Sequence, residues 1–328
     1  MPRLWQSCTR SEGEVILGEV HELITRYGHR AARDMVAAED RRFVDLAAST
    51  LGDEQGALGY LYSGFAMTAL PHRRLTDDAD AWHRQNGRFN LMVEPGFIPG
   101  TDGKPSRQGV PYGSRARLIL LYLQTEAIRT NSPEVRLGNT MHDWLDRMGV
   151  KSGGSSYNAI RDQSRRLSAC RLTVSWTSED GRSGFERANI VSAMMFAPGG
   201  SRQGALWDET ARLSPEFFLA LRDHPLPVSE AAIKAIQNSS AVMDIYIWLC
   251  YRLRSVVKPT FVPWPALHQQ FGSEYKQIRQ FRAKFLPALK EALAVYPDAN
   301  VEVDGDGLRL LPSRPAVPER RVVAISSS

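Results

Sequence analysis

The stretch GGSSYNAIRDQSRRLS, residues 153–168, decides the fold class of this chain. Its two glycines and two serines form a turn that can begin a helix. After that turn, Tyr157, Ile160 and Leu167 recur at helical spacing and form an inward face, whereas the outward positions are polar or basic. The stretch therefore predicts an amphipathic helix whose polar face is open to a partner.

The segments on both sides of this helix predict a small helical domain with a hairpin. Residues 115–130 form a strongly apolar helix, and Met141, Trp144, Leu145 and Met148 fall on one face of a short second helix. Two strands follow the third helix, at 171–177 and 187–196, and a further strand is expected at 205–213. Three helices followed by a twisted hairpin is the order of a winged-helix domain.

The same order of elements repeats after a compact proline linker at residues 222–228. Ser229 and Ser240 are expected to cap two helices, and helices at 264–271 and 273–294 follow, the latter bent by Pro287. Val301 and Val303 alternate into a turn at Asp304–Gly307, and Leu308 and Leu310 alternate back, which is a hairpin pattern.

We therefore predict a mainly α protein with small antiparallel β hairpins (α+β), built from tandem winged-helix domains with an N-terminal helical extension. The expected boundaries are 1–56 for the extension, 57–223 and 224–312 for the two domains, and 313–328 for a disordered tail. Residues 12–51 read as helical with a break at Gly28, and either pack on the body or serve oligomerisation. Residues 88–94 read as a strand and 95–113 as a loop.

Composition excludes several classes of protein. The 328 residues are 43% hydrophobic and 23% charged, which is an ordinary globular composition, and we find no apolar run of transmembrane length. Three widely spaced cysteines argue against a disulfide framework and a cysteine zinc site, so a reducing, cytoplasmic location is expected.

Positive charge is concentrated in one segment of the chain. The net charge is only +5, but residues 252–290 hold eight basic residues and one acidic residue, Glu274. Such a patch is the electrostatic footprint of a phosphate-binding surface. The alternative is a solvated helix face.

Both polar helix faces are candidates for the DNA major groove, where arginine and lysine reach guanine edges or phosphates. Arg161, Arg165, Arg279 and Arg282 are the candidates for reading base edges, whereas Arg166, Lys276 and Lys284 would contact phosphates together with Arg182 and Arg187 of the hairpin. Further candidates on the two helices are polar: Ser155, Ser156, Asn158 and Gln280.

Enzyme motifs fail on inspection. His21-Glu22 begins like a zinc-protease helix, but Thr25 stands where the second histidine belongs. Gly103-Lys104 resembles the end of a phosphate-binding loop, but Pro105 replaces the serine or threonine that would hold magnesium. Asp77, Asp78 and Asp80 read as a solvated turn. We expect no catalytic residue, no metal site, no cofactor and no enzymatic activity.

Several strings resemble the RepA family of bacterial plasmid replication initiators. They are PYGSRARLILLYLQTEA (111–127), RLGNTM (136–141), the stretch 153–170, HPLPV (224–228) and MDIYIWLCYRL (243–253). The resemblance covers roughly residues 70–311.

The resemblance implies a protein that binds repeated sites, or iterons, in double-stranded DNA at its plasmid's origin, opens the adjacent AT-rich DNA and recruits the host initiator and replicative helicase. Related initiators carry tandem winged-helix modules, repress their own gene as homodimers and bind iterons as monomers. Three alternatives stay open: a transcriptional repressor without initiator activity, a DNA-processing enzyme such as a nickase or recombinase, and a protein-interaction scaffold. No membrane partner is expected.

Overall fold

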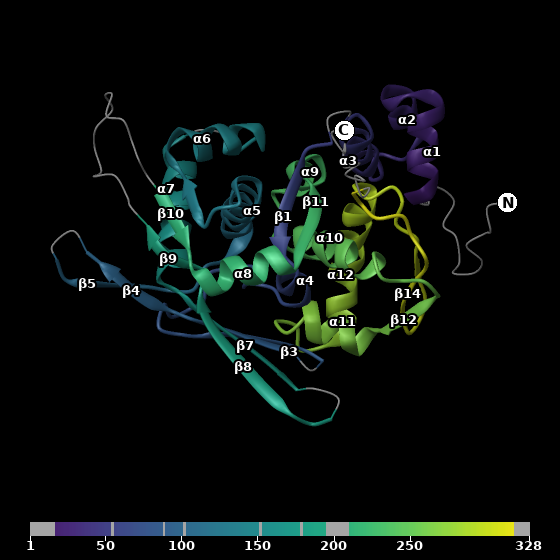
Figure 1. The fold of residues 1–328 in the computed structure, drawn as a ribbon. Helices are drawn as coiled ribbons and strands as arrows, with labels where there is room; N and C mark the ends of the chain where they lie inside the picture. The colour runs from purple at the N-terminus through teal and green to yellow at the C-terminus, as the bar shows by residue number, and fades with distance from the viewer. Residues whose placement is uncertain are drawn as a thin grey trace, which may run out of the picture.

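The computed structural model describes residues 17–53, 56–87, 89–100, 103–150, 153–177, 180–194 and 210–317. Within these ranges the protein is mainly helical with small antiparallel sheets, as the sequence predicts (Figure 1). The helices are α1 (Leu17–Tyr27), α2 (His29–Met35), α3 (Arg41–Leu51), α4 (Gly64–Met67), α5 (Gly113–Thr130), α6 (Gly138–Arg147), α7 (Gly154–Ala169), α8 (Pro215–Asp223), α9 (Glu230–Ile236), α10 (Ser240–Leu253), α11 (Trp264–Phe271) and α12 (Ile278–Ala294).

In the part of the chain that the structure describes, the strands form five antiparallel sheets of two to four strands. They are β1 (Leu58–Tyr62), β2 (Trp82–Asn86), β3 (Phe89–Glu94), β4 (Gly96–Pro99), β5 (Pro105–Gln108), β6 (Glu134–Arg136), β7 (Arg171–Thr177), β8 (Ser183–Asn189), β9 (Val191–Met194), β10 (Thr210–Leu213), β11 (Pro225–Ser229), β12 (Thr260–Pro263), β13 (Val301–Val303) and β14 (Gly307–Leu310).

Two parts of the chain share one topology. The first unit consists of α5, β6, α6, α7, β9 and β10, with the sheet order β6-β10-β9. The second unit consists of α10, β12, α11, α12, β13 and β14, with the sheet order β12-β14-β13. In each unit a helix, a strand, two helices and two strands follow one another, and the last strand lies in the middle of the sheet. This repeat supports the winged-helix interpretation, which stays a prediction.

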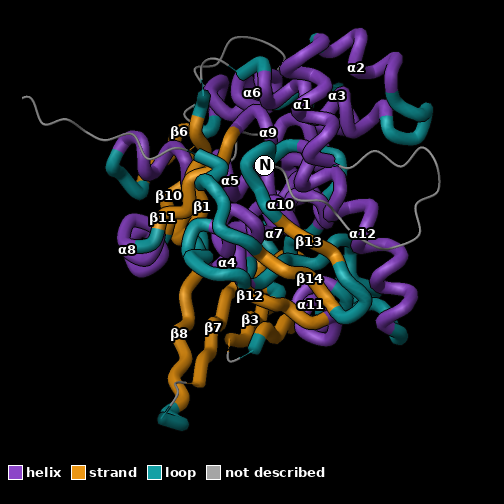
Figure 2. The backbone as a smooth tube through the Cα atoms, turned by 90° about the vertical axis from the view of Figure 1, so that its right-hand side faces the viewer, coloured by secondary structure: helices purple, strands orange, loops and turns teal. Residues whose placement is uncertain are grey.

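The first unit carries a large insertion between α7 and β9. The return strand predicted at 187–196 is two strands, β8 and β9, which separate at Ile190, a residue with no solvent exposure. β7 and β8 join β2 and β3 in a sheet of order β2-β3-β7-β8, and the β7–β8 ribbon runs well away from the body (Figure 2). A periodicity of two predicts a strand but not its sheet, because pairing partners lie far apart in sequence.

Two predicted loops are strands. Residues 95–113 contain the antiparallel pair β4–β5, and the proline linker 222–228 contains β11, which pairs with β1. The sequence did not indicate these strands because each contains prolines, at positions 99, 105, 225 and 227. Proline in a sequence argues against a central strand, but the strands of a two-stranded pair tolerate it at their open edges. The β1–β11 pair joins residue 58 to residue 229, so it crosses the predicted boundary between domains.

The N-terminal region is helical, as predicted, and the break at Gly28 has a φ of +80°. Its helices enclose a small core of their own and pack on the second unit: Arg42 pairs with Glu291 at 2.7 Å, and His21 Nε2 lies 2.8 Å from the Ala294 carbonyl oxygen. These contacts agree with packing on the body, and oligomerisation through the same helices stays a prediction. Residues 1–16, which include the start of the predicted helical segment, lie outside the described ranges.

Other boundaries differ by a few residues. Ser239, not Ser240, caps α10, whereas Ser229 caps α9 as predicted. Helix α12 begins at Ile278, five residues after the predicted start. In the predicted tail, Ser313 and Arg314 accept hydrogen bonds from Asn300 and Tyr296, so this part of the tail packs on the second unit. The remainder of the tail, 318–328, and the first residues of the strand predicted at 205–213 lie outside the described ranges.

Candidate nucleic-acid interface

The exposed part of α7 is its N-terminal half. Ser155 and Asn158 are exposed and Ser156 is half-buried, whereas Gln163, Ser164 and Leu167 in the second half are buried. The helix begins after two glycines and lacks a side-chain cap, so its leading backbone N–H groups face the same end as the polar side chains. The arrangement matches a recognition helix that enters a groove with its N-terminus.

Tyr157 and Arg161 form a pair on this exposed half. Tyr157 was predicted to point inward, but it is 55% exposed. Arg161 Nη2 donates to the Tyr157 hydroxyl at 3.0 Å, and its guanidinium lies 5.0 Å from the ring centroid. The tyrosine, one turn before it on the helix, holds the arginine in a defined orientation, which lowers the entropy lost when it contacts a base.

Arg166 is not available for the phosphate contact that the sequence suggested. It is 4% exposed, and its Nε and Nη1 atoms donate to Asp162 and Asp78, both at 2.9 Å. Hydrogen bonds from Arg74 and Arg166 lower the pKa of Asp78. Arg166 is therefore a structural residue that joins α7 to the segment before β2. Arg165 is half-buried on the same half of the helix.

The β7–β8 ribbon carries the two predicted hairpin arginines. Arg187 is exposed on β8, and Arg182 lies at the turn, where its Nε donates to Asp180 at 2.6 Å. Both are at the surface, as a phosphate contact requires. The pair with Asp180 offsets part of the charge of Arg182.

The leading turns of α12 form the most basic exposed surface of the second unit. Arg279, Gln280 and Lys284 are exposed on the helix, and Lys276 is exposed in the turn before it. Arg282 is half-buried, with its guanidinium 4.6 Å from the centroid of the Trp264 ring. All five side chains of this predicted set lie at or near the surface.

A turn between α11 and α12 holds this surface in place. His268 Nε2 lies 2.8 Å from the Tyr275 carbonyl oxygen, and a Cβ at Gly272 would collide with Phe281 and His268. Arg84 of β2, only 1% exposed, donates from Nη1 to Ser273 Oγ at 2.7 Å. Burial lowers the pKa of Arg84, against the attraction of Asp244 and Glu274. Sequence reasoning missed Arg84, because one arginine in a short polar strand carries no signal of burial.

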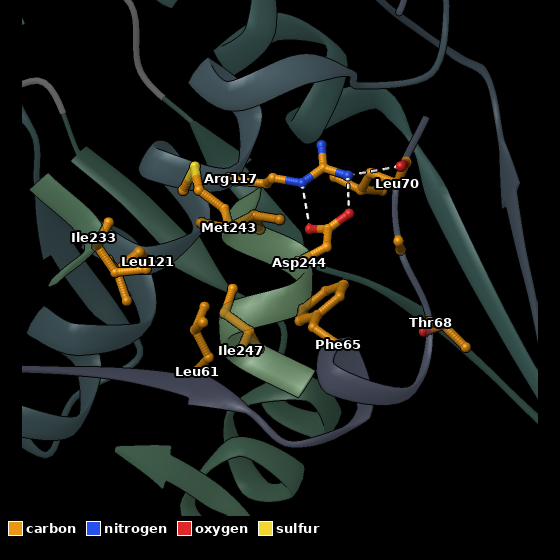
Figure 3. A pocket seen from close by; sticks show the side chains of 12 residues that line it. Leu61, Phe65, Thr68, Leu70, Arg117, Leu121, Ile233, Met243, Asp244 and Ile247 are labelled. Carbon is orange, nitrogen blue, oxygen red and sulfur yellow. Dashed lines mark hydrogen bonds and ion pairs between the residues drawn. The ribbon is translucent and has the colours of Figure 1, made fainter. Parts of the chain in front are cut away.

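A buried ion pair joins the two units. Arg117 of α5 donates to Asp244 of α10 from Nε at 2.6 Å and from Nη2 at 2.7 Å, and the same guanidinium donates to the Leu70 carbonyl (Figure 3). Apolar side chains such as Leu61, Phe65 and Ile247 line the small cavity beside this pair. Hereafter the Arg117–Asp244 pair is called the seam. Both residues lie within strings that resemble the RepA family, but nothing in the sequence indicates that they meet.

The acidic turn at Asp77, Asp78 and Asp80 does not form a metal site in the described ranges. Asp78 of the acidic turn is committed to Arg74 and Arg166, and no group of three His, Cys, Asp or Glu side chains there could hold a metal ion. In those same ranges no helix is long and apolar enough to cross a membrane.

A comparison with protein families agrees with the resemblance carried by the strings. Residues 110–260 match a family model described as plasmid encoded RepA protein. Two crystal structures of domains 2 and 3 of RctB are similar at 15% and 14% identity, with TM-scores of 0.48 and 0.45, covering 76% and 75% of this chain and 97% and 94% of those chains. No curated protein matches the chain.

The matched segment begins just before α5 and ends at β12, so it contains the first unit, its ribbon, the linking strand β11 and the start of the second unit. All of the strings quoted for the resemblance lie within these residues. Across residues 110–260, this chain is therefore similar to the plasmid-encoded RepA proteins.

Proposed function

We propose that this protein initiates plasmid replication by binding repeated origin sites in double-stranded DNA through its two units. The match of residues 110–260 to plasmid-encoded RepA proteins carries the proposal and supports an initiator role. The exposed polar ends of α7 and α12, each in a unit of the same topology, support duplex binding by two winged-helix modules.

In this proposal the two helices enter two successive major grooves on one face of the duplex. These grooves lie one helical turn, roughly 34–36 Å, apart. Arg161, Arg279 and Arg282 read base edges, and Lys276 and Lys284 contact phosphates with Arg187 and Arg182. Arg165 stays a candidate base contact, at the margin of the exposed surface. The protein needs no catalytic residue or cofactor, because opening the origin draws on binding energy and DNA deformation.

The first test is a binding titration on the DNA that flanks the gene, against scrambled DNA of equal length, at two salt concentrations. We expect laddered, sequence-specific binding that weakens steeply with salt, and loss of that binding in the Arg279→Ala/Arg282→Ala double variant. Arg26→Ala/Arg30→Ala is the matched control, because both arginines are exposed on N-terminal helices outside the proposed interface. Equal affinity for both DNAs, or none at low salt, would refute the proposal and favour a scaffold.

A second assay separates initiation from the rival functions. A plasmid bearing the flanking DNA should replicate only when the gene is supplied, since a repressor without initiator activity would bind but not support replication. Magnesium-dependent cleavage of supercoiled plasmid by the purified protein would instead indicate a nickase or recombinase. Recruitment of the host initiator and helicase, and repression by a homodimer, follow from the same proposal and are measured by pull-down and by sedimentation with and without DNA.

A further inference from the structure

The β4–β5 hairpin, Gly96–Gln108 and hereafter called the arm, is not assigned to any role by the proposed function. Its two strands pair only with each other and extend from the body at the left of Figure 1. A two-stranded ribbon without a sheet to cover it is marginally stable in water, so its attachment must hold it in place.

Two glycines fix the arm to α7. A Cβ at Gly96 would collide with the carbonyl oxygen of Ala169 at the end of that helix. A Cβ at Gly109, directly after the arm, would collide with Asp78 and Arg166, which are paired at 2.9 Å. Both ends of the arm therefore rest on the second, buried half of α7, behind the exposed N-terminal half that is proposed to read DNA, and Arg166 serves as part of the arm's base.

One face of the arm carries an unusual exposed pair. Phe97 is 58% exposed and lies directly opposite Arg107, whose guanidinium is 5.2 Å from the centroid of the phenyl ring. An exposed aromatic ring loses contact with water only when a partner covers it. A planar cation stacked on an aromatic ring presents N–H donors at its edge, which suits phosphate or base acceptors.

The strand edges of the arm are unsuited to pairing with another strand. Pro99 and Pro105 face each other across the ladder, and neither has an N–H to donate. Proline at an exposed edge protects against addition of a further strand. The edges of the arm are therefore less suited to a partner than the face that carries Phe97 and Arg107.

We propose that the arm binds the DNA minor groove beside the major-groove site of α7, with Phe97 as an apolar wedge and Arg107 in the groove. Residues 96–108 hold Lys104 and Arg107 against one acidic residue, Asp102, so the arm has a net charge of +1, the sign that complements DNA. Phenylalanine wedges that partly unstack a base step kink DNA by roughly 20–90°. The arm bends the site, which makes the opening of adjacent DNA easier. This inference rests on the proposed function.

The experiment measures the bend angle by energy transfer between dyes at the two ends of the flanking-DNA duplex, with affinity and salt slope measured alongside. Phe97→Ala should abolish the bend and weaken binding about 10-fold, while Phe97→Trp keeps both. Arg107→Ala should lower the salt slope by about 1 if the guanidinium neutralises one phosphate. Ser106→Ala is the matched control, because Ser106 lies next to Arg107 on the opposite face of the arm.

The outcomes separate this inference from the proposed function. If the wild-type protein binds without sequence preference, the proposed function fails first. If it binds specifically and Phe97→Ala bends the DNA as much as the wild type does, the arm proposal is overturned. A change in the sedimentation of the free protein with an unchanged bend would also overturn it, since the face would then contact a second copy of this chain.

Discussion

The first and second units share six elements in the same order and the same sheet order, but they expose different charges. The β7–β8 ribbon inserted into the first unit carries Arg182 and Arg187, whereas the β13–β14 turn of the second unit holds Asp304 and Asp306. The second unit concentrates its positive charge on and before α12 instead. A shared topology therefore does not imply the same contact with DNA, because charge is set by surface residues that the fold leaves free.

The two units also differ in how their reading helices are held. Helix α7 buries its second half through Arg166, Asp162 and Asp78, and the arm rests on that half. Helix α12 is held by the packing of Phe281 and Phe285 against rings of α11 and by the turn that Arg84 contacts. Four predictions test this contrast.

The largest effect is expected at the seam between the units. Asp244→Leu leaves Arg117 buried without the carboxylate that balances its charge, so the free energy of unfolding should fall by about 3–5 kcal/mol. Urea denaturation followed by tryptophan fluorescence measures this loss. Arg117→Met/Asp244→Leu should recover most of it, because no buried charge then remains. If the double variant is as unstable as Asp244→Leu, the ion pair itself stabilises the packing of α5 against α10, and this explanation is wrong.

The helix surfaces come next. If the second unit depends on its helix for DNA contact, Arg279→Ala/Arg282→Ala should weaken specific binding about 100-fold, since each base contact is worth roughly 1–3 kcal/mol. Arg161→Ala in the first unit should cost only about 10-fold, because the hairpin arginines share the contact there. Fluorescence anisotropy on one origin site measures the affinity of both variants. Equal losses of affinity would show that the two units do not differ in how far they depend on their helix.

A smaller effect is expected from Arg166→Met. The substitution removes charged hydrogen bonds to Asp78 and Asp162, so stability should fall by about 1–3 kcal/mol. The salt slope of DNA binding should not change, because Arg166 contacts no phosphate. A lower salt slope of DNA binding with an unchanged free energy of unfolding would contradict this, and would indicate that Arg166 contacts a phosphate as the sequence suggested.

The smallest effect concerns pH at the seam. His72 Nδ1 lies 3.0 Å from Ser240 Oγ, and burial lowers the pKa of His72 from 6.5, against the attraction of Asp244 and Glu274 and together with the repulsion of Arg117 and Arg84. The unfolded chain then binds more protons than the folded one just below pH 6.5, so stability should fall as the pH drops from 6.5 toward the folded pKa. Denaturation midpoints at several pH values measure this dependence, which His72→Asn should flatten.

The sequence by itself determined most of the local structure. Helical periodicity placed α5, α7, α10 and α11 to within a few residues, and short strings were enough to indicate the RepA resemblance. It also identified the basic surface of α12, because charge on one face of a helix follows from spacing alone. Proline and glycine concealed β4, β5 and β11, since their strand role depends on which edge faces solvent.

Only the tertiary structure decided which charged side chains lie at the surface, where they could contact DNA, and which form ion pairs inside the molecule. Arg161 and Arg166 are both arginines of one helix, yet the first is on the surface with Tyr157 and the second is buried against Asp78, a residue 88 positions away. The Arg117–Asp244 pair, the Arg84–Ser273 contact and the seating of the arm on α7 likewise join residues distant in sequence. Spacing along a chain fixes the face of a helix, but the partner of a side chain is fixed only when separate elements pack together.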